Sequence, residues 1–404
     1  MRADRSPNPA FYEVKKVYQQ VWFEKQDNKL VLTNEFMFTS LDKFGAKFEL
    51  LRDGKLVNIK ECDLPAVAPL SKGEMPIPFE IEGEGEYVIN CYAVVKEDYD
   101  VYKKGDVIAE CQINLTGYVP KEFVEAQGKT AFYEDDKILL ECANLVCEVS
   151  KNSGYITSIR KNGVEQITTP LRPNFWRASI DNDKSPQVPQ FAIKLLGKTF
   201  YKDCDRKMVK SNISIGDRRV EIDWSCFPQM TVLKTVYEAG EDGLKVYMRV
   251  RNHFFGLPRY GFRMGLDTTD KVKFFGRGPH ENYCDRKAAA KLGIYEGAVA
   301  DFEHNYLVPQ ENGNHCDTRF VEVGENGLRF EALSAPFEFS VHDYTQEALE
   351  EATHAHELKH GDCIELYIDG KQRGVGGDIP ALACIKKPYK IPANKVHELE
   401  FIIK

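Results

Sequence analysis

Short apolar or alternating segments, each bounded by polar turn residues, recur along most of the chain. Near the N-terminus they predict strands at 46–51, 55–59, 87–95 and 107–115. Asp53 and Gly54 separate the first two strands, and an Asp-Gly pair accepts the positive φ angles of a tight hairpin turn. Segment 87–95 is apolar on both faces, which is typical of a strand buried on both sides. Together these strands predict an immunoglobulin-like β-sandwich.

A second and longer β region follows a predicted boundary at residue 118. It opens with a meander whose strands are expected at 145–149, 155–160 and 164–167. Further strands are predicted at 220–227, 232–238, 244–252, 272–275, 328–332, 337–341, 363–369 and 397–403. So many strands exceed one small sandwich but suit a large two-sheet sandwich, because all-β domains can reach about 250 residues. We therefore predict an all-β chain with one domain at 1–118 and a second at 119–404.

Helical patterns are few. Residues 189–200 carry a mixed apolar pattern that predicts a short helix. Residues 344–351 predict a second helix, with Thr345 near their start as a candidate N-cap. Residues 8–18 predict a third helix, and Pro9 is compatible with its first turn.

Composition narrows the class of protein. The 404 residues contain 54 Lys and Arg against 62 Asp and Glu, which gives a net charge of −8. This acidic balance, with no basic block, argues against nucleic-acid and anionic-membrane partners. No segment approaches the ~18 apolar residues that span a bilayer, and the first residues lack the apolar region of a signal peptide. The eleven Cys are scattered without a C-x-x-C pair, which favours reduced, buried thiols over disulfides or a zinc framework.

The densest polar segment spans residues 276–286 and follows a predicted apolar strand. One interpretation is a sugar or carboxylate pocket in which Arg277 and Arg286 donate hydrogen bonds and Glu281 and Asp285 accept them. The other is a network of Arg–carboxylate pairs that fixes a long loop. Taken alone, the residues favour the network.

Two further segments invite a chemical interpretation. Alternation along a strand would place His354, His356 and His360 on one face, but the spacing lacks the helical H-E-x-x-H pattern of a zinc site. Hydrogen bonding along a sheet face is the favoured role. Residues 374–378, GVGGD, lack the Lys and Ser or Thr of a phosphate loop and predict a tight bend with close backbone approach.

Four segments carry a resemblance to a known family. Residues 274–286 read FFGRGPHENYCDR, residues 169–183 read TPLRPNFWRASIDND, and residues 306–313 read YLVPQENG with Thr-Arg at 318–319. Residues 368–370 and 374–378 read IDG and GVGGD. In this order they resemble signatures of the C-terminal small-chain domain of glycoside hydrolase family 2 β-galactosidases. Residues 3–15 and the turn at 63–69 are similar to the passage that leaves the family's barrel and to its immunoglobulin-like domain.

The resemblance implies an immunoglobulin-like domain followed by a large galactose-mutarotase-like β-supersandwich. It also implies that the nucleophile, the acid/base glutamate and the magnesium ligands lie on a catalytic (β/α)₈ barrel that this chain lacks. No catalytic residue, cofactor or metal is therefore expected here, since a retaining glycosidase needs two facing carboxyls and barrel sites lie at the ends of barrel strands. Some family members close the sugar pocket with a Trp just after GGD. Ala381 stands nearest to that position, so Asp378 and Ala381 are expected on a pocket-rim loop that lacks this platform.

The leading hypothesis is a non-catalytic C-terminal part of a β-galactosidase, whose partner is the parent enzyme's barrel and whose full enzyme is a homo-oligomer. One alternative is a stand-alone carbohydrate-binding module with Arg277, Glu281, Asp285, His354 and His356 as tentative galactoside ligands. Another is aldose 1-epimerase activity, which rests on fold analogy alone and needs an acid and a base facing one sugar. The sequence leaves open a bacterial cytoplasmic or periplasmic location.

Overall fold

The computed structural model describes residues 5–98, 101–184, 202, 208–226, 231–253, 256–376 and 385–404. The helix predicted at 189–200 lies outside these residues. The chain divides into two compact units. Unit 1 comprises Met1–Val119 with Ala288–Ile294, and unit 2 comprises Pro120–Lys287 with Tyr295–Lys404. Among the described residues, no helix has both the length and the apolar character needed to cross a membrane.

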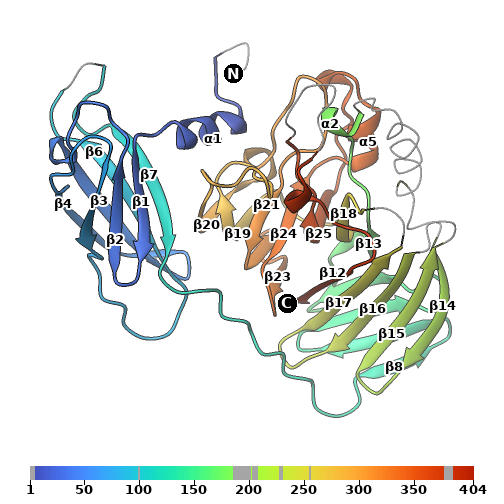
Figure 1. Ribbon diagram of the computed structural model, residues 1–404. Coiled ribbons are helices and arrows are strands. Elements are labelled where there is room, and N and C mark those ends of the chain that lie inside the picture. Colours follow the sequence, from blue (N-terminus) through green and yellow to red (C-terminus); the bar gives the residue numbers. More distant parts are fainter. Residues whose placement is uncertain are drawn as a thin grey trace. The chain divides into compact units, whose positions relative to one another are not determined.

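Unit 1 contains two antiparallel sheets (Figure 1). The first has the order β1-β2-β5, and its strands are β1 (Val21–Gln26), β2 (Lys29–Asn34) and β5 (Ser71–Pro76). The second has the order β4-β3-β6-β7, with β3 (Phe44–Arg52), β4 (Lys55–Asp63), β6 (Tyr87–Val95) and β7 (Val107–Asn114). The predicted hairpin between β3 and β4 is confirmed, since Asp53 and Gly54 adopt φ angles of 50° and 76°.

Apolar side chains fill unit 1. Phe23 on β1 meets Phe48 on β3 edge to face, with ring centroids 6.2 Å apart, and both rings are buried. Strand β6 is buried along most of its length, as its two apolar faces predict. Burial of side chains from both sheets in one cluster supplies the hydrophobic driving force for this unit.

Helix α1 (Pro9–Val17) begins with Pro at its first turn, as the sequence predicts. Its Lys16 and the following Gln19 reach β7, whereas the exposed large side chains are apolar. The exposed set consists of Phe11, Tyr12, Val14, Val17 and Tyr18. The helix thus departs from the usual amphipathic arrangement, because Lys16 contacts the protein while several large apolar side chains are exposed. The short helix η1 (Leu41–Lys43) precedes β3.

Unit 2 is built from two larger antiparallel sheets. The ten-stranded sheet follows the order β21-β24-β25-β18-β13-β11-β10-β9-β8, with β12 paired to β11. Its strands are β8 (Ala131–Glu134), β9 (Lys137–Cys142), β10 (Leu145–Ser150), β11 (Ile156–Lys161), β12 (Val164–Glu165), β13 (Ile167–Asn174), β18 (Arg259–Leu266), β21 (His315–Thr318), β24 (Phe337–His342) and β25 (Ile364–Gln372).

The nine-stranded sheet follows the order β14-β15-β16-β17-β26-β23-β22-β19-β20. Its strands are β14 (Met208–Ile215), β15 (Arg219–Cys226), β16 (Thr231–Ala239), β17 (Leu244–Asn252), β19 (Lys271–Gly278), β20 (Lys291–Ala298), β22 (Phe320–Val323), β23 (Leu328–Ala332) and β26 (Val396–Ile403). Only residues 295–298 of β20 belong to unit 2, since residues 291–294 are part of unit 1.

Aromatic side chains join the two large sheets. Phe262 on β18 packs against Phe401 on β26 with ring centroids 5.9 Å apart, and Phe274 on β19 packs against Phe339 on β24 at 4.9 Å. These contacts confirm a two-sheet sandwich and the all-β class. The single strand predicted at 164–167 is wrong in detail: it divides into β12 and the start of β13. The Glu165 carboxylate accepts hydrogen bonds from the backbone N–H groups of Ile159 and Ile167 at this division.

Short helices fill some of the connections in unit 2. They are α2 (Asp181–Lys184), α5 (Gln346–Glu351), η2 (Val299–Asp301), η3 (Ala355–Glu357) and η4 (Lys387–Tyr389). The cap predicted at Thr345 is confirmed, because its side chain accepts a hydrogen bond from the backbone N–H of Ala348 at 3.1 Å.

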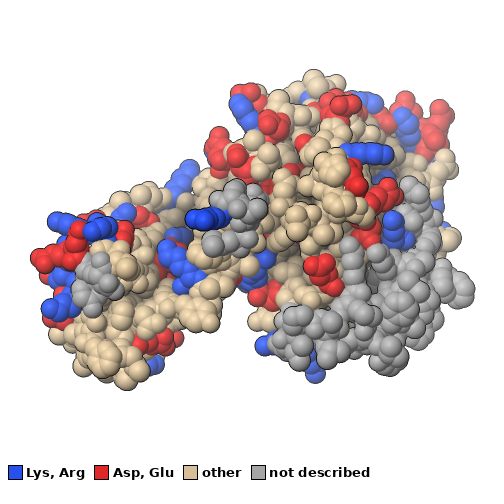
Figure 2. Space-filling view, turned by 90° about the horizontal axis from the view of Figure 1, so that it is seen from above, with Lys and Arg blue, Asp and Glu red and all other residues tan. Residues whose placement is uncertain are grey.

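The described cysteines are free thiols, and most of them are buried, as the sequence predicts. Charged side chains of both signs are interspersed over the described part of the face in Figure 2.

Candidate functional site: a buried charge network

Side chains from two of the motif segments, 169–183 and 274–286, reach residues 373–376, the backbone directly after β25 that contains part of a third motif. Arg177 donates to the carbonyl oxygens of Arg373 and Gly374 at 2.7 and 3.0 Å. Asn182 donates to the carbonyl of Val375 at 2.7 Å. The N–H groups of the same stretch are bound as well: those of Val375 and Gly376 donate hydrogen bonds to the Asp285 carboxylate at 3.1 and 2.8 Å. Side chains from two distant motifs therefore hold both the donors and the acceptors of this stretch.

Glycine is required where Asp285 approaches the backbone. A Cβ at Gly374 would lie 2.3 Å from the nearer Asp285 carboxylate oxygen, and one at Gly376 would lie 3.2 Å away. The first distance is too short for any side chain unless Asp285 moves. The close backbone approach predicted for this glycine-rich segment is confirmed, and the approaching group is a carboxylate.

Ion pairs support the guanidinium of Arg177, which is almost completely buried. Its Nε lies 3.2 Å from an Asp183 carboxylate oxygen, and Asp183 also pairs with Arg373. Burial alone would raise the pKa of Asp183, but the two guanidiniums hold that pKa well below its usual range. Asp183 therefore stays charged and fixes Arg177 in place.

Glu281 anchors the loop before β21. Its buried carboxylate pairs with Arg286 and accepts hydrogen bonds from the Tyr306 hydroxyl at 2.5 Å and the Gly313 N–H at 2.7 Å. Burial, with the nearby Glu281 charge, raises the pKa of Tyr306. Tyr306 therefore remains a hydrogen-bond donor to this carboxylate.

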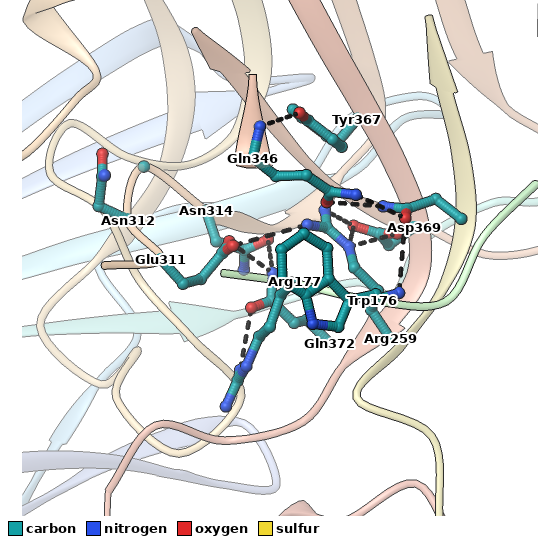
Figure 3. Close-up of polar contacts among 12 residues, drawn as sticks. Trp176, Arg177, Arg259, Glu311, Asn312, Asn314, Gln346, Tyr367, Asp369 and Gln372 are labelled. Atoms are coloured by element: carbon teal, nitrogen blue, oxygen red, sulfur yellow. Dashed lines mark hydrogen bonds and ion pairs between the residues drawn. The ribbon is translucent and has the colours of Figure 1, made fainter. Parts of the chain in front are cut away.

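A second group of charges lies on the central strands of the ten-stranded sheet. Arg259 on β18 donates from Nε to both Asp369 oxygens on β25, at 3.0 Å each. Its Nη1 lies 3.7 Å from Glu311. Gln372 links the two groups, because it accepts a hydrogen bond from Arg177 at 2.9 Å and donates one to Glu311 at 3.1 Å (Figure 3).

Glu338 on β24 lies opposite Asp369 on β25. One Glu338 oxygen accepts from Asn314 Nδ2 and from the Gln372 N–H, each at 3.1 Å. Burial, followed by the charge of Asp369, raises the pKa of Glu338 to about 7. Burial also raises the pKa of Asp369 to about 6, although Arg259 opposes this shift.

These acids bind groups of the protein itself. Glu281, Glu311, Glu338, Asp285 and Asp369 each accept hydrogen bonds from side-chain or backbone donors of this chain. Unpaired buried charge is costly, whereas a paired charge with several hydrogen bonds fixes its neighbours in position. The arrangement is therefore suited to holding the backbone of strand ends and loops.

The structure places the predicted site residues in different surroundings. Arg277 pairs with Asp317 at 2.5 Å, whereas Glu281 and Asp285 belong to the charge network described above. The Arg–carboxylate network favoured for residues 276–286 is thus present. Asp378 and Ala381 lie outside the described residues.

The sheet-face position expected for the histidines is wrong. His354 and His356 lie at and within η3 and are exposed. The Glu357 carboxylate accepts the backbone N–H groups of Thr353 and His354, which closes a helical turn instead of a strand. Among the described residues, no group of three or more His, Cys, Asp or Glu is arranged to hold a metal ion.

Sequence reasoning missed the central pair Arg259–Asp369 and the buried Glu338. Arg259 and Arg263 interrupt an otherwise apolar and glycine-containing segment, so β18 was not recognised. A charged residue every fourth position within apolar surroundings was the available signal, because buried arginines need acidic partners.

Fold and network together define an all-β chain of two units, the second organised around buried ion pairs. A family model described as "Beta galactosidase small chain" matches residues 141–403, and one described as "Beta-galactosidase, domain 4" matches residues 30–116. The chain belongs to the β-galactosidase small-chain family and corresponds to a C-terminal part of a β-galactosidase.

Curated relatives agree. The chain is 31% identical to a β-galactosidase of Vibrio cholerae over 397 residues, which covers 93% of this chain and 38% of that protein. It is 28% identical to a β-galactosidase of Halalkalibacterium halodurans, covering 99% of this chain and 40% of the relative. The chain thus spans about two fifths of the length of these relatives. A solved structure titled as a putative aldose 1-epimerase from Escherichia coli K12 is similar with a TM-score of 0.38 and 11% identity, covering 66% of this chain and 98% of that one.

Proposed function

We propose that this chain is a non-catalytic part of an enzyme that hydrolyses terminal β-D-galactosides. It supports the catalytic barrel and one rim of the sugar pocket. The observation that carries the proposal is the stretch 373–376, which side chains from separate family motifs hold by its carbonyl and N–H groups. Three side chains devoted to the backbone of one strand end indicate that the position of this strand end matters for function.

The stretch 373–376 directly precedes the positions expected on the pocket rim, Asp378 and Ala381. Arg177, Asn182 and Asp285 would therefore set the point from which the rim begins. Among the candidate galactoside ligands, Arg277 pairs with Asp317, Glu281 pairs with Arg286, and Asp285 binds the backbone of residues 375 and 376. His354 and His356 contact each other, with ring centroids 5.6 Å apart. No observation therefore favours the stand-alone sugar-binding module over the supporting role.

The exposed apolar side chains of α1 support a contact with the barrel. Contiguous exposed apolar residues on a helix are typical of an interaction surface. Phe11, Val14 and Val17 would be covered by the part of a β-galactosidase that this chain does not span. Magnesium would be held on that barrel. The full enzyme would be a homo-oligomer, and this chain would contribute to its subunit contacts.

Catalysis by this chain alone is not expected. A retaining glycosidase needs one carboxylate free to attack the sugar and one carboxyl free to donate a proton. Glu311, Glu338 and Asp369 instead bind Gln372, Asn314 and Arg259.

The test is hydrolysis of a chromogenic β-galactoside by the purified chain, prepared from a host that lacks its own β-galactosidase. The expected rate equals that of buffer. Glu311→Gln and Glu338→Gln variants serve as matched controls. A rate above buffer that either variant abolishes would show that the buried acids are catalytic and would overturn the proposal.

A further inference from the structure

Two buried cysteines face each other in unit 1. Cys91 on β6 and Cys111 on β7 are directly opposite in the antiparallel register, and both are buried free thiols. Directly opposed residues of antiparallel strands have Cα atoms about 4.5–5.5 Å apart, within the range of about 4.4–6.8 Å that a disulfide accepts. The backbone can therefore carry a bond between these two sulfurs.

The surroundings of Cys111 differ from those of an ordinary buried thiol. The ammonium of Lys16 on α1 lies 2.9 Å from its sulfur, and the side-chain amide of Gln19 lies 3.5 Å away. Lys16 also donates to the carbonyl oxygen of Glu110, which fixes the ammonium beside the sulfur. The ammonium is therefore placed to stabilise the negative charge that develops on this sulfur when it attacks an oxidant.

Cys91 has a different environment. It is completely buried, and burial raises the pKa of its thiol although the charge of Lys16 opposes this shift. It therefore stays protonated and suits the second, resolving position of a two-cysteine pair. Cys111 retains 8% exposure, so a small oxidant has the shorter path to its sulfur.

We propose that Cys111 and Cys91 form a peroxide-sensitive pair that closes to a disulfide between β6 and β7. The Cys111 sulfur attacks one peroxide oxygen and loses its proton, the O–O bond breaks, and the sulfur becomes a sulfenic acid while the other oxygen takes up that proton and leaves as water. The Cys91 sulfur then attacks the sulfenic sulfur, loses its proton and displaces the hydroxyl as a second water. Two thiols and one hydrogen peroxide thus yield one disulfide and two waters. This inference is independent of the proposed function.

A second cysteine pair in unit 2 provides an internal control. Cys142 ends β9 and Cys147 lies on β10, and both are buried free thiols. The Cys142 side chain and burial raise the pKa of the Cys147 thiol, and the negative charge of Glu165 adds to this shift. The register of this pair is diagonal, since Cys142 lies opposite Leu145 and Cys147 lies opposite Leu140. Because negative charge disfavours a thiolate, the pair is a reference for slow bridge formation, and the Lys16 variants below separate the effect of charge from that of register.

The experiment exposes the purified chain, carrying Cys62→Ser to remove one exposed thiol, to low concentrations of hydrogen peroxide. Proteolysis without reductant and mass spectrometry then identify the linked peptides. A Cys91–Cys111 bridge is expected to form about tenfold faster than a Cys142–Cys147 bridge, and dithiothreitol should reverse it. A Cys142–Cys147 bridge that forms as fast or faster would overturn the proposal.

Two sets of variants separate activation from packing. Lys16→Met should slow bridge formation about tenfold, whereas Lys16→Arg should restore most of the rate because it keeps the positive charge. Cys91→Ser should stop at the Cys111 sulfenic acid, which dimedone traps. An unchanged rate in Lys16→Met, or no dimedone adduct at Cys111 in Cys91→Ser, would contradict the proposal.

Discussion

The interiors of the two units differ in kind. Unit 1 is filled by apolar side chains from both of its sheets, such as Phe23 and Phe48. Unit 2 has an aromatic layer between its sheets, but its central strands also bury Arg259, Asp369 and Glu338. Apolar burial is non-directional and tolerates rearrangement, whereas a buried charge demands particular partners at particular distances. The comparison indicates that the central strands of unit 2 add buried ion pairs to apolar burial, and that these pairs fix particular neighbours.

The largest effect is expected from Arg259→Met, which leaves the carboxylates of Asp369 and Glu311 buried without their guanidinium. The free energy of unfolding of unit 2 should fall by about 3–5 kcal/mol. Urea denaturation followed by Trp fluorescence measures it, since Trp176 and Trp224 lie in unit 2.

The matched control is Lys29→Met in unit 1, which removes an ion pair with Glu74 whose side chains are both more than half exposed. No measurable change is expected there, because water and salt screen such pairs. If Arg259→Met lowers the free energy of unfolding as little as the control does, the buried charges do not depend on their particular partners.

An intermediate effect is expected from Glu338→Gln, and it depends on pH. Burial and Asp369 raise the pKa of Glu338 from 4.5 to about 7, so the folded protein binds a proton more tightly than the unfolded chain. The stabilisation from this proton is complete below about pH 4.5 and is lost as the pH rises toward about 7. Glutamine does not titrate, so the variant should gain about 2 kcal/mol relative to the wild type across this interval.

Unfolding free energies of both proteins at several pH values check this prediction. A difference that stays constant with pH would show that Glu338 titrates normally. The same measurement on Asp369→Asn is the companion experiment, because the charge of Asp369 contributes to the raised pKa of Glu338.

The smallest effect is expected from Phe48→Leu in the apolar interior of unit 1. Neighbouring side chains can shift to fill most of the lost volume, so the cost should be about 1 kcal/mol. Thermal unfolding of the variant measures it. A loss of unfolding free energy as large as that of Arg259→Met would show that both interiors are equally sensitive to substitution.

The sequence predicted the elements whose signal is local. Strands β6, β17 and β23 lie where uninterrupted apolar or alternating runs predicted them, and Thr345 caps α5 as its residue type indicates. Strand β18 was missed because its arginines break the apolar pattern. Their acidic partners lie on other strands, about a hundred residues away in sequence.

The candidate site divides in the same way. The motif residues were recognised as a group, and an Arg–carboxylate network was favoured for residues 276–286. That Asp285 binds the backbone of residues 375 and 376 could not be predicted, because the two are 90 residues apart. In the histidine segment a local pattern was misleading. The alternation of His354 and His356 suggested a strand, but the Glu357 carboxylate closes a helical turn there.

The central claim is that the side chains of Arg177, Asn182 and Asp285 hold the backbone at residues 373–376, and amide hydrogen exchange in Asp285→Ala tests it most directly. Loss of the carboxylate frees the N–H groups of Val375 and Gly376, so their exchange should accelerate at least about tenfold. Amides of β3 in unit 1 should be unchanged, and Asp285→Asn, which keeps one acceptor oxygen, should lie between. Unchanged exchange at Val375 and Gly376 in Asp285→Ala would contradict the account.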